Sequence, residues 1–221
     1  FTIDAAPYTM PHRRKSVGRS LPMPAAHSSP TCSWSGVLPA VTTQFDADLR
    51  LDLAATRAVQ SALIEDGVHG LVALGTVGEN NSLTAEEKRS VLRTAVEAAA
   101  GRVPVVAGVS ELTTAAAVAF ARDAQALGAT GLMLLPAMVY VPSARELEFH
   151  FRSVAEVTRL PIMLYNNPPA YRVSIDVETL GRLADVPNIV AVKESSADPR
   201  RFTDVVNAGG ERFVLFAGLD D

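Results

Sequence analysis

The stretch GLVALGTVGENNSLTAEEKRSVLRTAVEAAAGRVPVVAGV, residues 70–109, decides the fold. It opens and closes with short apolar runs that lack polar alternation, which is typical of strands buried on both faces. Between them, Thr84 and Glu87 form a capping box ahead of an amphipathic pattern, and Gly101 stands where a helix would end. The stretch therefore predicts a strand, a helix and a second strand.

The same unit recurs along most of the chain. A second capping box at Ser143 and Glu146 and a second helix stop at Gly128 indicate further helices. The runs expected to be strands are residues 36–41, 70–74, 103–109, 131–135, 162–165, 189–192 and 213–217. Repeated strand–helix units make a parallel sheet, either doubly wound or closed into a barrel. Because no Gly-x-Gly-x-x-Gly fingerprint follows the first run, we expect an α/β protein with a TIM (β/α)8 barrel.

The chain of 221 residues divides into two regions. Residues 1–35 are rich in proline, serine and basic residues and show no periodicity, so we expect a disordered basic tail or a transit-peptide-like extension. Residues 36–221 form the expected barrel domain. A complete barrel has eight strands and about 250 residues. The seven runs found here therefore predict a barrel truncated after strand 7, without strand 8 and the C-terminal helices.

Composition argues against several classes of protein. The net charge of −4 gives no attraction to nucleic acid or to an anionic membrane surface. No apolar run approaches the roughly 18 residues of a membrane span. Cys32 is the only cysteine, and His12, His27, His69 and His150 stand far apart, so we expect neither a disulfide framework nor a metal site. A cytoplasmic protein is expected.

A lysine stands at the carboxyl end of one buried run, which is where a barrel carries its catalytic groups. Lys193 directly follows residues 189–192 and is one of three lysines in the chain. An amine in apolar surroundings keeps its uncharged form more readily, as a Schiff-base nucleophile requires. The alternative is a lysine at the barrel rim, paired with Glu194 or Asp198.

Two other strand ends carry candidates. Tyr165 ends the run 162–165, one strand away from Lys193. Its phenol could therefore relay protons. The alternative is a strand-end tyrosine whose hydroxyl faces water. The loop GTVGEN, residues 75–80, sets two glycines around Thr76 ahead of a helix. Such a turn suits a small carboxylate, although glycine-rich turns are common in these loops without any ligand.

Together these motifs resemble those of the dihydrodipicolinate synthase and N-acetylneuraminate lyase family of class I aldolases. The likeness runs from residue 36 to residue 221, in the order GVLPAVTTQF, GTVGEN, VPVVAGV, LYNNP, VAVKES and FVLFAGLDD. The resemblance implies that Lys193 forms the Schiff base with pyruvate or another 2-oxo acid and that Tyr165 relays protons. It also implies that the substrate is bound by Gly75, Thr76, Val77 and Gly218.

The sequence departs from the family pattern at three places. Val77 stands where a second hydroxyl residue is common. Ala170 stands where the synthases carry an arginine for the second substrate, with Arg172 two residues later. Val139 stands where they carry a tyrosine, with Tyr140 adjacent. Tyr140 and Arg172 are therefore the candidates for binding the second substrate, and the departures favour a sister activity over lysine biosynthesis itself.

The expected function is that of a lyase or synthase that forms a lysine imine with a 2-oxo acid and makes or breaks a carbon–carbon bond with an aldehyde or sugar-acid substrate. The resemblance implies no metal or organic cofactor, because the protonated imine is itself the electron sink. It also implies a homo-oligomer, a dimer or the family's tetramer.

One alternative is a 2-keto-3-deoxy sugar acid dehydratase that uses the same imine. An alternative of another class is a truncated, non-catalytic fragment.

Overall fold

The computed structural model describes residues 32–137 and 140–219. The expected N-terminal tail lies outside the described residues up to position 31. Of its last four positions, Trp34 is buried against the inner face of the sheet, with its ring directly over Gly131. A side chain at Gly131 would collide with that ring, so the glycine provides the space that the indole fills. The packed region therefore includes Trp34, two residues before the expected start of the domain.

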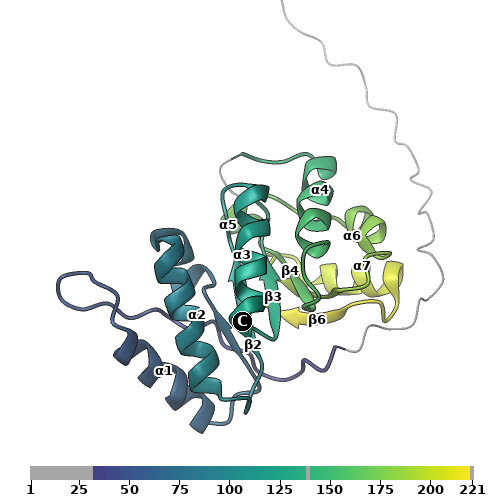
Figure 1. Cartoon of the computed structure of the whole chain (residues 1–221). Helices are drawn as coiled ribbons and strands as arrows, with labels where there is room; N and C mark the ends of the chain where they lie inside the picture. The colour runs from purple at the N-terminus through teal and green to yellow at the C-terminus, as the bar shows by residue number, and fades with distance from the viewer. Residues whose placement is uncertain (1–31, 138–139, 220–221) are drawn as a thin grey trace, which may run out of the picture.

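Parallel strands and helices alternate along the described part of the chain (Figure 1). The strands are β1 (Leu71–Ala73), β2 (Val105–Val109), β3 (Gly131–Leu134), β4 (Ile162–Asn166), β5 (Ile189–Glu194) and β6 (Val214–Ala217). The helices are α1 (Leu53–Glu65), α2 (Ala85–Ala99), α3 (Thr114–Ala126), α4 (Ala144–Ala155), α5 (Pro168–Tyr171), α6 (Val177–Leu183) and α7 (Arg200–Gly209), with 3-10 turns η1 (Thr76–Gly78) and η2 (Asn80–Ser82).

The strand order explains the barrel form. All six strands are parallel, and their order in the sheet, β1-β2-β3-β4-β5-β6, is their order in the sequence. Each crossover therefore steps in the same direction, and right-handed crossovers then place the helices on one face. A sheet wound this way curves as the wall of a TIM barrel does, whereas a doubly wound sheet would reverse its order. The expected fold class is confirmed.

The first expected strand, residues 36–41, is wrong as a strand. The segment runs alongside β1, where the amides of His69 and Val72 donate to the carbonyls of Val37 and Pro39. Only a single bridge, between Ala40 and Val72, meets the pattern of a strand. Pro39 has no amide hydrogen, so it interrupts the ladder at its centre.

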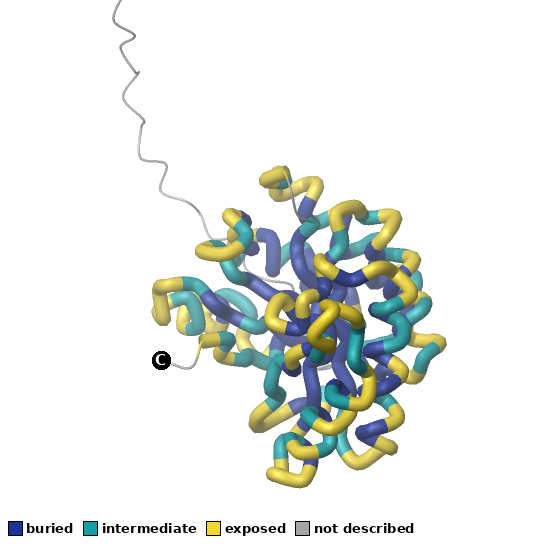
Figure 2. The backbone as a smooth tube through the Cα atoms, turned by 90° about the vertical axis from the view of Figure 1, so that its left-hand side faces the viewer, coloured by how far each residue is buried: buried dark blue, intermediate teal, exposed yellow. Residues whose placement is uncertain are grey.

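Two apolar layers lie on opposite faces of the sheet. The larger layer fills the space between the strands and the helices, and the smaller one fills the inner face around Met133, Met163 and Tyr165. The strands accordingly form the dark, buried centre of the molecule in Figure 2. β6 differs, because Val214, Leu215 and Phe216 are only half-buried and Ala217 is exposed.

Local signals set the helix starts. Both expected capping boxes are confirmed: the Thr84 hydroxyl accepts from the Glu87 amide ahead of α2, and Ser143 and Glu146 do the same ahead of α4. Each box satisfies amides that have no partner within the helix. Two of the helices that follow strands, α2 after β1 and α4 after β3, therefore begin at defined residues.

Candidate active site

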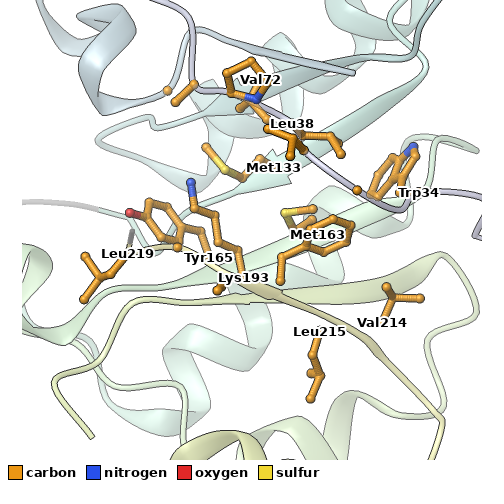
Figure 3. Close-up of a pocket in the computed structure, with 18 of the residues that line it drawn as sticks. Trp34, Leu38, Val72, Met133, Met163, Tyr165, Lys193, Val214, Leu215 and Leu219 are labelled. Carbon is orange, nitrogen blue, oxygen red and sulfur yellow. The ribbon is translucent and has the colours of Figure 1, made fainter. Parts of the chain in front are cut away.

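A cavity of about 880 Å³ opens at the inner face of the sheet, at the carboxyl ends of the strands. Its apolar wall includes Val72, Met133 and Met163, and Lys193 and Tyr165 project into it side by side (Figure 3). The expected substrate-binding residues also line this cavity; they are Gly75, Thr76, Val77 and Gly218. The fold thus brings together six residues that come from four separate parts of the sequence.

Lys193 and Tyr165 are neighbours because of strand register. They are directly paired across β4 and β5, so both side chains emerge on the same face. The Lys193 Nζ lies 4.6 Å from the centre of the Tyr165 ring. At this distance the ring face attracts a cation. The pair therefore places an amine and a phenol within reach of one small molecule.

The alternative partners of the lysine lie elsewhere. Glu194 points to the opposite face of β5, and Asp198 pairs with Arg200 at 2.7 Å. Among the described residues, no carboxylate forms an ion pair with the Lys193 amine, and no polar atom forms a hydrogen bond with it. The described surroundings of Lys193 are therefore the apolar wall and the phenol.

The Tyr165 hydroxyl receives two hydrogen bonds that the sequence analysis did not anticipate. Asn167 Nδ2 donates to it at 3.0 Å, and the Ser195 hydroxyl donates to it at 3.4 Å. Both donors lie in motifs that the sequence analysis quoted, Asn167 in YNNP and Ser195 directly after Lys193 and Glu194. With both acceptor positions of the oxygen engaged, the phenol proton is directed to the remaining side.

A buried clamp fixes the two strand ends from behind. Asn166 Nδ2 lies 2.9 Å from both carboxylate oxygens of Glu194, and Glu194 also accepts from the Ser196 amide at 2.8 Å. Arg201 approaches the same carboxylate at 3.5 Å. Because Asn166 and Glu194 directly follow Tyr165 and Lys193, the clamp holds the register on which the pair depends.

The loop after β1 holds Thr76 at the mouth of the cavity. Asn80 is fully buried under this loop, and its amide donates to the carbonyls of Leu74 at 3.0 Å and Gly108 at 3.1 Å. Thr76 and Val77 are exposed in the η1 turn above it. A further residue missed by the sequence analysis appears here: the phenol of Tyr171 forms a hydrogen bond with the Thr76 hydroxyl.

Gly218 follows β6 and closes the cavity beside the lysine. A Cβ atom at this position would lie 2.9 Å from Lys193 Cε and 2.0 Å from Ser195 Oγ. Only glycine therefore lets the chain pass this close to the lysine stem. The Gly218 amide donates to the Glu194 carbonyl at 2.8 Å, which extends the ladder between β5 and β6.

The two residues expected to bind a second substrate are not part of the cavity wall. Tyr140 is 86% exposed, and Arg172 is an exposed residue with positive φ at the end of α5.

The part of the chain that the structure describes contains no group of three or more His, Cys, Asp or Glu side chains arranged to hold a metal ion. None of its helices combines the length and apolar character needed to cross a membrane.

The dihydrodipicolinate synthetase family matches residues 33–221 of the chain. The chain belongs to this family. It is 40% identical over 187 residues to the 4-hydroxy-tetrahydrodipicolinate synthase of Moorella thermoacetica, and it is 38% identical over 184 residues to that of Halalkalibacterium halodurans. These matches cover 85% and 83% of this chain but 64% and 62% of the relatives, so the chain spans less than two thirds of their length.

Solved structures of the family share the fold. Dihydrodipicolinate synthase from Bacillus anthracis matches with a TM-score of 0.80 at 34% identity, covering 84% of this chain and 64% of that one. A prophage protein of the same family from E. coli K12, crystallised in complex with pyruvate, matches with a TM-score of 0.81 at 30% identity. That match covers 86% of this chain and 65% of the prophage protein.

Proposed function

We propose that the chain acts as a Schiff-base lyase or synthase on pyruvate or a closely related 2-oxo acid. The observation that carries the proposal is the Lys193 amine beside the Tyr165 phenol, inside a cavity at the strand ends of a family fold. The pyruvate complex of the E. coli family member supports this substrate class.

The proposed reaction uses this pair in order. The Lys193 amine adds to the keto carbon, and loss of water gives the protonated imine. Tyr165 relays the protons that this addition and loss require. Removal of a C3 proton then gives an enamine, whose C3 carbon attacks an aldehyde carbonyl to form the new carbon–carbon bond. Cleavage runs through the same steps in reverse.

The protonated imine itself accepts the electron pair that the C3–H bond leaves behind when the proton is removed. The proposal therefore includes no metal and no organic cofactor. Thr76, with the backbone at Gly75 and Val77, is proposed to bind the carboxylate of the 2-oxo acid, and Gly218 leaves room for the lysine stem. Residues 75–77 follow β1, whereas Gly218 directly follows β6.

Covalent trapping tests the proposal. The folded 221-residue chain is incubated with pyruvate and borohydride, and the adduct is weighed and mapped. We expect one reduced adduct, at Lys193 rather than at Lys15 or Lys88. Lys193→Ala removes the amine, and Lys193→Arg replaces it with a guanidinium that does not form an imine, so neither should be labelled. A folded wild-type chain that is labelled no more than Lys193→Ala contradicts the proposal and supports the non-catalytic alternative.

A 2-keto-3-deoxy sugar acid dehydratase is the second candidate. Val77 and Ala170 lack the hydroxyl and the arginine of the synthase pattern, which favours a sister activity, and the dehydratase is one such activity. The curated relatives, in contrast, are named as synthases. Incubation with a 2-keto-3-deoxy acid separates the two. Pyruvate plus an aldehyde indicates a lyase, whereas a dehydrated 2-oxo acid indicates the dehydratase.

We further propose a homodimer or homotetramer in the cytoplasm. Large apolar side chains are exposed on the loops that follow the neighbouring strands β2 and β3, at Leu112, Tyr140 and Val141. Large apolar side chains that are exposed together mark protein contact surfaces. Sedimentation velocity measures the assembly state, and a monomer at micromolar concentration would contradict this part of the proposal.

A further inference from the structure

Tyr171 joins two parts of the cavity mouth that are far apart in the sheet. It is the last residue of α5, the short helix after β4, and its phenol bonds to the Thr76 hydroxyl in the loop after β1. Strands β2 and β3 lie between β1 and β4, so the contact crosses the mouth of the barrel. The Tyr171 ring also meets the Tyr165 ring edge-on, with 5.7 Å between the centroids.

The local sequence explains why the phenol reaches this point. Asn167 caps α5 by accepting from the Ala170 amide at 3.2 Å, and Pro168 occupies the first helical position. The turn ends at Arg172, whose positive φ stops the helix directly after Tyr171. The same Asn167 side chain donates to Tyr165, so one amide fixes both phenols.

We propose that Tyr171 is a positioning residue that directs the Thr76 hydroxyl toward the carboxylate of the 2-oxo acid. This inference rests on the proposed function. A hydroxyl has one donor and two acceptor positions. If the Tyr171 phenol donates to Thr76 Oγ1, the single hydrogen of Thr76 is free to donate to the carboxylate.

The environment of Tyr171 fits a donor. Burial raises the pKa of the Tyr171 phenol, and the nearby Tyr165 raises it further, although the bond to Thr76 acts in the opposite direction. The phenol therefore keeps its proton near neutral pH. Its ring packs against the inner apolar layer, which limits its movement.

Substrate trapping with two carbonyl compounds tests this role. Tyr171→Phe keeps the ring and removes the hydroxyl, and Ser174→Ala, which removes an exposed hydroxyl three residues away, is the matched control. We expect Tyr171→Phe to raise the half-saturating pyruvate concentration about tenfold, because a hydrogen bond to an anion is weakened. Hydroxyacetone is a ketone without a carboxylate, so its trapping should not change. Ser174→Ala should behave as wild type with both compounds.

A variant pair sharpens the test. Thr76→Val should give the same loss as Tyr171→Phe, and the double variant should be no worse than either, because the two hydroxyls act as one unit. Equal losses with pyruvate and hydroxyacetone in Tyr171→Phe would overturn the inference, since they would show general support of Tyr165. An unchanged half-saturating pyruvate concentration would also overturn it.

Lactate separates this inference from the proposed function. It has the carboxylate but no keto group, so it binds without forming an imine. Tyr171→Phe should weaken lactate binding about tenfold in equilibrium dialysis, whether or not wild type is labelled by pyruvate. If wild type is not labelled, the proposed function fails while the lactate result still decides the role of Tyr171. Equal lactate affinity in wild type and Tyr171→Phe, or no lactate binding in either, rejects that role.

Discussion

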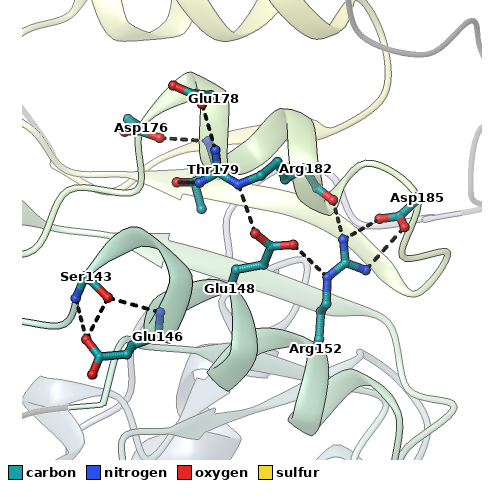
Figure 4. A network of polar contacts seen from close by, with 9 residues as sticks. All are labelled: Ser143, Glu146, Glu148, Arg152, Asp176, Glu178, Thr179, Arg182 and Asp185. Atoms are coloured by element: carbon teal, nitrogen blue, oxygen red, sulfur yellow. Dashed lines mark hydrogen bonds and ion pairs between the residues drawn. The ribbon is translucent and has the colours of Figure 1, made fainter.

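Polar side chains gather in two regions that differ in how their charges are paired. Between α4 and α6, Glu148 accepts from Arg152 at 3.0 Å and from Arg182 at 2.9 Å, and Arg152 also binds Asp185 (Figure 4). At the ends of β4 and β5, the Lys193 amine faces a phenol and forms no ion pair within the described ranges.

Charged and polar side chains are arranged differently in the two regions. In the helix network every charged group forms an ion pair and is partly exposed. These ion pairs link α4 to α6 and to the residues that follow it, and they leave no unpaired amine or carboxylate there to transfer a proton. In the strand region the paired groups, Asn166 and Glu194, lie behind the sheet, and Lys193 and Tyr165 lie in front of it. The side chains of the clamp and those of the proposed reactive pair thus alternate along the same two strands.

The largest effect is expected from breaking the clamp behind the site. Glu194→Ala leaves Asn166 and the Arg201 guanidinium without their buried partner, which should lower the free energy of unfolding by about 3–5 kcal/mol. Glu194→Gln keeps one acceptor oxygen and should cost less. Urea unfolding followed by circular dichroism measures both. Equal stability of Glu194→Ala and wild type would show that the clamp does not hold the strand ends.

The next effect concerns the face of the sheet that carries the proposed reactive pair. Tyr165→Phe keeps the ring beside Lys193 but removes the hydroxyl that Asn167 and Ser195 bind. Exchange of the pyruvate C3 hydrogens with deuterated solvent, followed by NMR, reports enamine formation and should slow at least about 100-fold. The stability of the variant serves as the control, because the ring packing is unchanged. Exchange within about threefold of wild type would contradict a proton-relay role.

The sequence could predict those features that depend on local patterns. The unbroken apolar run over 189–192 placed Lys193 at a buried strand end, and the capping boxes at Thr84 and Ser143 marked where helices begin. It also left Glu194 as a candidate partner of Lys193, although neighbours in a strand point to opposite faces. The expected strand over 36–41 failed because a single proline removes the central donor of the ladder.

Contacts that depend on the curvature of the sheet could not be predicted. Tyr171 and Thr76 are separated by 95 positions, and they meet only because the sheet bends across two intervening strands. Trp34 lies in a segment whose composition resembles a tail, yet its ring fills the space above Gly131 on the inner face. In both cases tertiary packing determines which residue is the partner. A short window of sequence carries no information about that packing.

The smallest effect is expected in the helix network. Glu148→Gln keeps the shape of the side chain but removes the charge shared by Arg152 and Arg182. Because these groups are partly exposed, solvent screens the loss, and the free energy of unfolding should fall by less than about 1 kcal/mol. Pyruvate trapping at Lys193 should not change. Raising the salt concentration should shrink the stability difference further, since salt screens exposed ion pairs. If Glu148→Gln lowered the free energy of unfolding as much as Glu194→Ala, burial would not explain the difference in stability between the two regions.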